Sequence, residues 1–421
     1  MEHVTLTPMT RVAGVLALIV VVTVTVAVGG AQQPQTPVFR GGVELVAVDV
    51  QVIDKSGQPM PALTPANFDV SINGKSRRVV SADFIRHAAS APGGPADAIA
   101  ATLRPEAAAA GGATGRTIIL AVDEHSFSAG AAQAAMQAAG RFLDHLEPND
   151  RVGLYAYPTG ASGFDLTRDH AAVRKSLDKV VGLLELPTSR FNLSSTEVID
   201  ITSADTVALD MVAERECTVG GVKRPNDSGC RRDIRMDAIS IAGMLEIQVG
   251  QSIHGLHALL ETLSRRPGRK ILVVVSGGLL ASDRPGGRPD LTMETLRLGE
   301  EAAAANTSLY GLHMDSSFID AFSAGTKRGA TSSLMRDSSV LGRGFERFTA
   351  AAGGTLIRVE AGTGDSAFAQ VLRETSAFYL LAVEPTEADR DGKSHPIRVK
   401  VNARGATVRS RASVIIPKAG Q

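Results

Sequence analysis

The sequence predicts an α/β fold, in which a mainly parallel sheet is flanked by helices and joined to a small β-sandwich. Between residues 117 and 376, short apolar segments of β type alternate with segments of helical periodicity, which is typical of parallel sheets. Outside that region, residues 38–87 and 377–417 contain only short strand-like segments separated by turns. Because the C-terminal group is too small to be stable alone, we expect it to pack with the N-terminal group into one sandwich.

The first 31 residues have the pattern of an export signal peptide. Arg11 precedes an uncharged run at residues 12–28, and Gly29 and Ala31 supply the small side chains of a cleavage site. The run of about 17 residues is near the lower limit for a membrane span, so a retained anchor is the alternative. We therefore expect an exported protein, periplasmic or secreted, or alternatively one anchored by its N-terminus in the inner membrane.

The N-terminal β unit, residues 38–87, contains three strand-like segments, at residues 43–53, 68–72 and 78–84. Asn73 and Gly74 between the second and third segments predict a hairpin turn, because both residues tolerate positive φ. Residues 88–116 are rich in Ala, Gly and Pro and have little periodicity, so we expect a linker there.

The α/β region, residues 117–376, follows the linker. We expect its strands at residues 117–122, 152–157, 270–275, 308–312 and 355–359. Helical spacing of apolar residues predicts helices at residues 131–146, 171–183, 235–264, 293–305, 342–351 and 366–375. Between them, residues 184–237 are expected to form an irregular insertion. The C-terminal strands are expected at residues 378–383, 396–401 and 407–415.

The chain has two cysteines, Cys217 and Cys230, both in this insertion. An even pair at short spacing in an exported chain predicts a disulfide. Two free thiols are the alternative. Zinc is the weaker hypothesis, because no histidine lies between or beside the two cysteines.

Composition argues against several classes of function. Lys and Arg total 44 and balance 44 Asp and Glu, so there is no basic footprint for nucleic acid. The sequence contains no His-Glu-x-x-His helix, no Gly-x-Ser-x-Gly elbow and no phosphate-binding Gly-x-x-x-x-Gly-Lys motif. We therefore expect a protein that is not an enzyme.

The strongest candidate site is the end of the strand at residues 117–122. This apolar strand stops at Asp123 and Glu124, and Ser126 and Ser128 follow before the next helix begins. Ligands bind at the carboxyl edge of open α/β sheets, and hard divalent cations take oxygen ligands. The alternative is that both acids simply favour the N-terminus of the following helix through its dipole.

These features together resemble the von Willebrand factor A (VWFA) superfamily, and more closely the exported bacterial (Acidobacteria-type) VWFA-related domain proteins. The resemblance extends from about residue 39 to residue 417 and is distributed over several segments. They read VELVAVDVQVIDKSGQPMPALTPANFDVSINGK, TIILAVDEHSFS, LEPNDRVGLYAY, RPGRKILVVVSGGL and ANTSLYGLHMD. The cysteine-containing segment AERECTVGGVKRPNDSGC is similar to a subgroup insertion. The resemblance implies a doubly wound, VWFA-like sheet.

The metal-site pattern of that superfamily is only partly present. Its first loop reads Asp-x-Ser-x-Ser, but after Asp123 the two serine positions fall on His125 and Phe127. A frame shifted by one residue, from Glu124 through Ser126 to Ser128, restores both hydroxyls. The later acidic position falls on Gly277. For the middle-loop threonine the candidates are Thr188, Ser194, Ser195 and Thr196.

The resemblance and these departures predict an exported VWFA-like module for protein–protein interaction or adhesion, with a degenerate metal-dependent site. Its partner would be a protein of the cell envelope or the extracellular space; a membrane would be involved only if the signal segment is retained. No cofactor is certain, and Mg²⁺ or Ca²⁺ would bind only weakly at Asp123, Glu124, Ser126 and Ser128, which form either a partner-binding loop or a vestigial metal site. The alternatives are a hydrolase or other enzyme using acids at the sheet edge, or a scaffold with a vestigial site.

Overall fold

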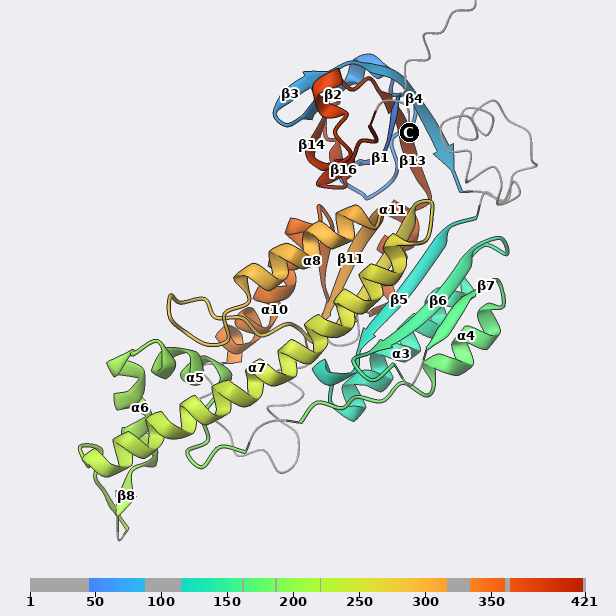
Figure 1. The fold of residues 1–421 in the computed structure, drawn as a ribbon. Coiled ribbons are helices and arrows are strands. Elements are labelled where there is room, and N and C mark those ends of the chain that lie inside the picture. The colour runs from blue at the N-terminus through green and yellow to red at the C-terminus, as the bar shows by residue number, and fades with distance from the viewer. Residues whose placement is uncertain are drawn as a thin grey trace, which may run out of the picture. The chain divides into compact units, whose positions relative to one another are not determined.

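A computed structural model describes residues 45–87, 115–160, 163–185, 188–219, 221–315, 334–359 and 364–418 (Figure 1). The expected signal segment at residues 1–31 and most of the expected linker lie outside the described residues. Among the described residues, no helix is both long enough and apolar enough to span a bilayer.

The centre of the α/β region is a six-stranded sheet in the order β12-β11-β10-β5-β6-β7. Its strands are β5 (Thr117–Asp123), β6 (Arg151–Tyr157), β7 (Phe164–Thr167), β10 (Lys270–Ser276), β11 (Thr307–Met314) and β12 (Thr355–Val359). Five of these strands are parallel, and only the edge strand β7 runs antiparallel. The expected mainly parallel sheet is therefore confirmed, whereas β7 was not predicted.

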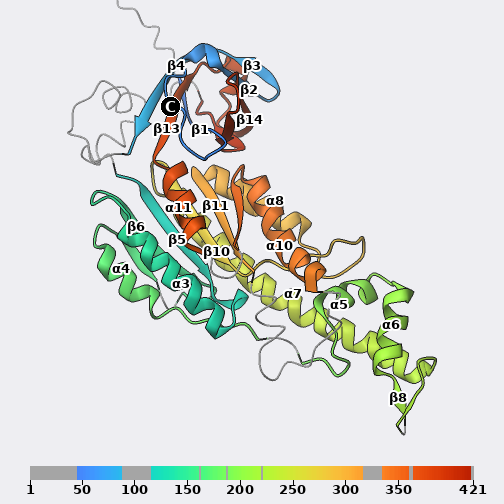
Figure 2. The same ribbon diagram turned by 180° about the vertical axis from the view of Figure 1, so that it is seen from behind.

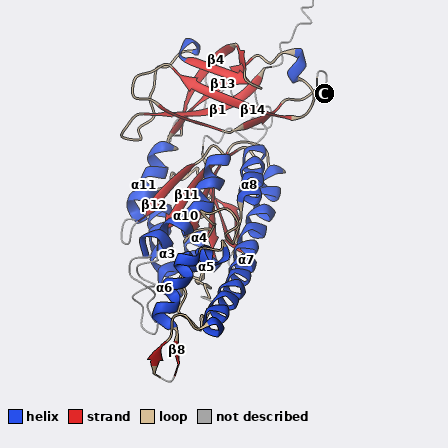
Figure 3. Ribbon diagram, turned by 90° about the vertical axis from the view of Figure 1, so that its left-hand side faces the viewer, coloured by secondary structure: helices blue, strands red, loops and turns tan. Residues whose placement is uncertain are grey.

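Helices cover both faces of this sheet, which is why its inner strands are apolar throughout (Figure 3). One face packs against α3 (Ala129–Asp144), α4 (His170–Leu177) and α11 (Gly364–Glu374), where Phe142 and Phe368 lie 5.0 Å apart between ring centroids. The opposite face packs against α7 (Ser228–Ser264), α8 (Thr292–Ala304) and α10 (Leu334–Ala351). Successive residues of β5 alternate between these two cores: Ile118 lies in the first and Ile119 in the second.

The two ends of the described chain form two four-stranded antiparallel sheets. Their orders are β15-β1-β13-β4 and β16-β14-β2-β3. The strands are β1 (Val46–Ile53), β2 (Phe68–Ile72), β3 (Lys75–Arg77), β4 (Val79–Arg86), β13 (Ala377–Val383), β14 (Ser394–Val401), β15 (Thr407–Ser410) and β16 (Ser413–Ile415). Val48 is paired with Leu381 and Ile72 with Ile397, so both sheets combine early and late strands, which alternate in the first sheet and form two adjacent pairs in the second. Their inner faces share one apolar core that includes Val50, Phe68 and Tyr379.

The sandwich contains two strands more than expected. The strand expected at residues 78–84 is present as β4, but the turn with Asn73 at φ 51° and Gly74 at φ 75° joins β2 to an additional short strand, β3. The chain then changes sheet at Arg78, and β4 pairs with β13 instead. Residues 407–415 divide in the same way into β15 and β16, which belong to different sheets. Each chain segment thus contributes to both layers.

The expected irregular insertion is largely helical, so that prediction was wrong. It contains α5 (Ser195–Thr202), α6 (Thr206–Glu216), the hairpin of β8 (Thr218–Val219) and β9 (Val222–Lys223), and the start of the 37-residue helix α7. We call residues 195–240 the helical arm. Figures 1 and 2 show its elements gathered around one end of α7, and a small core of its own includes Leu209, Val212 and Ile234.

The predicted disulfide is present in this arm. Cys217 at the end of α6 is bonded to Cys230 in the first turn of α7, with their Cα atoms 6.0 Å apart. The bond closes the segment that carries the β8–β9 hairpin. A capping box also fixes the start of α5, because the Ser194 side chain accepts from the Glu197 backbone while Glu197 accepts from the Ser194 backbone.

Candidate functional site

Polar side chains form a row along the carboxyl edge of the central sheet. Tyr157 of β6 is paired with Asp123 of β5, and Ser276 of β10 is paired with His313 of β11. The Ser276 hydroxyl lies 3.2 Å from Asp123 Oδ2, and this contact joins the two pairs. His313 is paired in turn with Arg358 of β12. The parallel strands therefore bring five polar residues, distant in sequence, to one edge.

The Asp123 carboxylate is enclosed and fully hydrogen-bonded by its own chain. Its side chain has no exposed surface. The Ser252 hydroxyl of α7 donates to Oδ1 at 2.8 Å, and the Ser276 hydroxyl donates to Oδ2 at 3.2 Å. Burial raises the pKa of Asp123 to about 7, while these two hydrogen bonds oppose the shift. The carboxylate thus serves as an internal acceptor.

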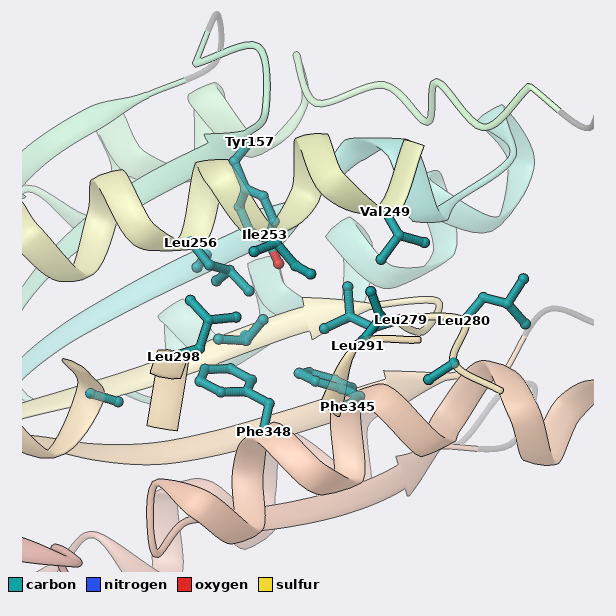
Figure 4. Packing of buried hydrophobic residues seen from close by; sticks show 14 of the residues in the cluster. Tyr157, Val249, Ile253, Leu256, Leu279, Leu280, Leu291, Leu298, Phe345 and Phe348 are labelled. Carbon is teal, nitrogen blue, oxygen red and sulfur yellow. The ribbon is translucent and has the colours of Figure 1, made fainter. Parts of the chain in front are cut away.

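Helix α7 closes this edge of the sheet from one side. The Tyr157 ring packs against Gly255, where a Cβ would lie 2.8 Å from the Cβ of Tyr157, so only glycine allows this approach. Figure 4 shows Tyr157 among Ile253, Leu256 and other apolar side chains of the same core. The Tyr157 hydroxyl is buried and has no hydrogen-bond partner among the described residues. Burial, aided by the nearby Asp123 charge, raises the pKa of Tyr157 far above its usual value, so the phenol stays neutral.

The other predicted acid, Glu124, is also enclosed, with 4% of its surface exposed. The Thr159 hydroxyl donates to its carboxylate. The Leu183 backbone N–H donates to the Glu124 carbonyl at 2.7 Å, and the Leu184 N–H donates to the Phe127 carbonyl at 2.9 Å. The segment after α4 therefore lies over the loop. Neither acid is available for direct contact with a partner in this structure.

Ser126 holds the loop together instead of pointing to an ion. Its hydroxyl donates to the Asp123 carbonyl at 2.8 Å and accepts from the Gly277 backbone N–H at 2.7 Å. An ideal Cβ built on Gly277 would overlap the Ser126 carbonyl oxygen, so no side chain fits at that position. The position that corresponds to the later acid of the VWFA pattern is therefore occupied by neighbouring backbone atoms.

The remaining predicted residues do not join this cluster. Ser128 is the N-cap of α3, but its side chain makes no capping hydrogen bond and none to Asp123. The backbone carbonyl of His125 accepts from Gln248 Nε2 of α7 at 3.0 Å. Among the candidates for the middle threonine, Ser194 caps α5 and the Thr196 N–H donates to Asp337 Oδ1 at 2.9 Å. The structure thus brings together Asp123 and Ser126, and leaves the others apart.

This donor set does not fit a divalent cation. Such an ion requires several oxygen ligands with substantial negative charge. Here the one carboxylate at the centre already accepts two hydroxyl hydrogen bonds, and the position of a second acid has no room for a side chain. Over the whole described part of the chain, no three His, Cys, Asp or Glu side chains are grouped as a metal would require.

The row also lacks the geometry of a nucleophile with its base. Ser276 Oγ donates to Asp123 and accepts from the Gly278 N–H at 3.0 Å. The histidine next to it, His313, directs Nε2 to the Gly277 carbonyl at 3.0 Å rather than to the serine. Burial lowers the pKa of His313, which favours the neutral ring. Ser276 and His313 are therefore neighbours on adjacent strands, but their side-chain atoms are not arranged for proton transfer.

Sequence reasoning missed Ser252, Tyr157 and His313 as members of this cluster. For Ser252 a signal exists: it interrupts the buried apolar face of α7 between Val249 and Leu256, and a polar residue on such a face requires a partner. For Tyr157 and His313, only the position at the end of a predicted parallel strand points to the sheet edge.

Neither a family model nor a curated protein matches this chain. Among the solved structures that resemble it is the pilus adhesin SpaC from Lactobacillus rhamnosus GG in its open conformation. The match has 10% sequence identity and a TM-score of 0.25, and it covers 72% of this chain and 44% of the adhesin. The chain therefore spans less than half of the length of that adhesin, and a likeness this distant carries no argument about function.

Proposed function

We propose that this chain is an exported, VWFA-like module that binds another protein and that its sheet-edge metal site is vestigial. The observation that carries the proposal is the pair of hydroxyl hydrogen bonds from Ser252 and Ser276 to Asp123. They satisfy the acid that a metal ion would otherwise bind. The remaining function of the domain is then to present a surface.

The vestigial site is supported by the energetics of the cluster. Each hydrogen bond to a charged group stabilises the fold by about 1.5–3 kcal/mol, and an ion would have to displace both hydroxyls. The loop is also tied to β10 through Ser126 and Gly277, so it does not move independently of the sheet. Binding of an ion would therefore form one bond to a carboxylate and break three hydrogen bonds within the protein.

Protein binding is supported by large apolar side chains on the outside of α6 and α7. The exposed fractions are 64% for Val207, 59% for Met211, 60% for Met236 and 67% for Ile247. Clustered exposed apolar side chains are typical of interaction sites, and methionine adapts its shape to a partner surface. Three of these four residues lie in the helical arm, and Ile247 continues the exposed side of α7.

The metal part of the proposal is tested by the melting temperature of the protein in EDTA, Mg²⁺, Ca²⁺ and Mn²⁺. A ligand that binds only the folded state raises the melting temperature. We expect equal melting temperatures in all four conditions at millimolar metal. A rise with any one cation that disappears in Asp123→Asn would show a working site and overturn this part.

The binding part is tested by photo-crosslinking in intact cells of the source organism. A photoreactive residue at Met236 is expected to give a discrete adduct with one protein, and Ile247→Glu in the same chain is expected to abolish it. Met293 on α8, which is 71% exposed, serves as the control position. Adducts that are the same at both positions, or that persist with Ile247→Glu, would count against a docking surface here.

A further inference from the structure

A small cavity lies at the amino edge of the central sheet, on the opposite side from Asp123. It measures about 20 Å³ and lies between strands β1 and β15 of the sandwich and the start of β11. The polar residues around it include Asp49, Gln51, Arg269, Arg409 and Arg411. This cavity is independent of the proposed binding function and uses none of its residues.

One donor in the cavity wall has no acceptor. Gln51 is buried, and its Oε1 accepts from the Tyr310 hydroxyl at 3.0 Å, which fixes the orientation of the amide. Burial raises the pKa of Tyr310, so this hydroxyl keeps its proton and remains a donor. Gln51 Nε2 has no hydrogen-bond partner among the described residues. A buried amide N–H₂ without an acceptor destabilises the fold, so a bound acceptor is favoured.

The charge of the cavity wall is positive. Three guanidinium groups, from Arg269, Arg409 and Arg411, line it, and the carboxylates around them are those of Asp49 in the wall and Glu374, which is ion-paired with Arg409. Among the described residues, these three positive and two negative groups leave a net charge of +1. A hydrogen-bond acceptor with one negative charge would neutralise this net charge and would also accept from Gln51 Nε2.

The guanidinium groups are held in place before any ligand binds. Arg269 donates to Ser308 Oγ from Nε at 3.1 Å and from Nη2 at 3.0 Å, and its guanidinium lies 4.4 Å from the centre of the Phe378 ring. Arg411 Nη2 donates to the Ala47 carbonyl at 2.7 Å. The positive field at the cavity is therefore preorganised, which lowers the cost of binding an anion.

Size restricts the ligand further. A cavity needs roughly 10–15 Å³ to hold one water molecule, so a cavity of about 20 Å³ has room for a single atom-sized ligand and is too small to enclose phosphate, sulfate or a carboxylate completely. We propose that this cavity is a binding site for one monovalent halide ion, chloride in the native protein, held by Gln51 Nε2 in the field of Arg269, Arg409 and Arg411. Chloride would act there as a structural ligand between the sandwich strands and the central sheet.

The direct test is a crystal of the protein grown or soaked in bromide. We expect an anomalous difference peak in the cavity within hydrogen-bond distance of Gln51 Nε2. In parallel, the melting temperature is measured in a series of buffers in which chloride replaces gluconate at constant ionic strength and pH. The expected result is a saturable rise of about 2 °C, because chloride binds the folded state only.

A matched pair of variants separates the site from general salt effects. Gln51→Glu places a carboxylate at the donor position and neutralises the net charge, so its melting temperature should not respond to chloride. Gln58→Glu changes the charge of the chain equally at an exposed position of the same sandwich and should respond like the wild type. If Gln51→Glu does not fold, the wild-type bromide map and chloride titration still decide.

Two results would overturn the proposal. A cavity that contains water and no anomalous peak in bromide would show that an uncharged acceptor satisfies Gln51. A bromide peak without a saturable chloride effect on the wild-type melting temperature would indicate an adventitious ion only.

Discussion

The carboxyl edge of the central sheet and the helical arm differ in how well the sequence pattern predicts which side chains are exposed. At the sheet edge, Asp123 and Glu124 have the composition of a ligand site, yet the chain encloses both acids and satisfies them with hydroxyls of Ser252, Ser276 and Thr159. In the arm, a sequence without a clear pattern forms ordered helices. These helices leave Met211 and Met236 largely exposed.

The difference shows that the residues with the most reactive chemistry are not those with the most accessible surface. The polar row is used for internal cohesion between β5, β10 and α7, and its groups would have to be uncovered before any ligand could reach them. The arm, by contrast, leaves large apolar side chains exposed to solvent. A search for the function of this chain should therefore begin at the arm.

The strongest test of the filled sheet edge is Gly277→Asp, which restores an acid at the position expected from the family pattern. We expect destabilisation by about 4 kcal/mol and no gain of metal affinity, because the new Cβ would overlap the Ser126 carbonyl and the charge would be buried without a partner. Denaturant unfolding measures this change. Gly130→Asp is the control: no atom lies within 4 Å of its Cβ, and an acid in the first turn of α3 is favourable. Equal losses of stability in both variants would show that the sheet edge has room for an aspartate side chain.

The second test is the pH dependence of stability. The folded pKa of Asp123, about 7, lies above the unfolded value near 3.9, so the folded state binds the proton more tightly. Stability from this group is therefore fully present below about pH 4 and is lost as the pH rises to 7. Asp123→Asn has no titrating group at this position. Between pH 4 and pH 7 its free energy of unfolding should therefore fall by roughly 3 kcal/mol less than that of the wild type. Asp165→Asn, at a fully exposed side chain, is the matched control. Parallel pH profiles for wild type and Asp123→Asn would contradict a buried titrating acid.

The third test concerns the arm. Replacement of both Cys217 and Cys230 by alanine releases the loop between them and should reduce stability by about 2–3 kcal/mol. Hydrogen exchange is the sharper measurement, because faster exchange should be confined to α6, the β8–β9 hairpin and the start of α7. If β5 and β10 exchanged faster as well, the arm and the sheet edge would form one cooperative unit rather than two separate ones.

The smallest expected effect on stability is that of Ile247→Glu. This side chain is 67% exposed, so the free energy of unfolding should change by less than about 0.5 kcal/mol. Ile253→Glu, on the buried side of the same helix, should instead prevent folding or lower the melting temperature strongly. A large loss for Ile247→Glu would show that this surface is internal to the fold.

Much of the fold was predictable because local patterns determine it. The apolar runs before Asp123, Tyr157 and Gly277 each end a parallel strand close to the expected position. The arm was missed although Ser194 and Glu197 form a readable capping box, because α5 and α6 are too short for periodicity to stand out. The site was less predictable still. Ser252 bonds to an acid 129 residues earlier, and no local spacing encodes that contact.

The interleaving of early and late strands has a consequence for how this protein is made. Within the described sheets, β1 and β4 pair only with β13 and β15, so these early strands have no permanent partner until the late strands have been synthesised. During that interval their hydrogen-bonding edges can join with those of other nascent chains. A truncated or stalled product without β13 and β15 would retain such open edges.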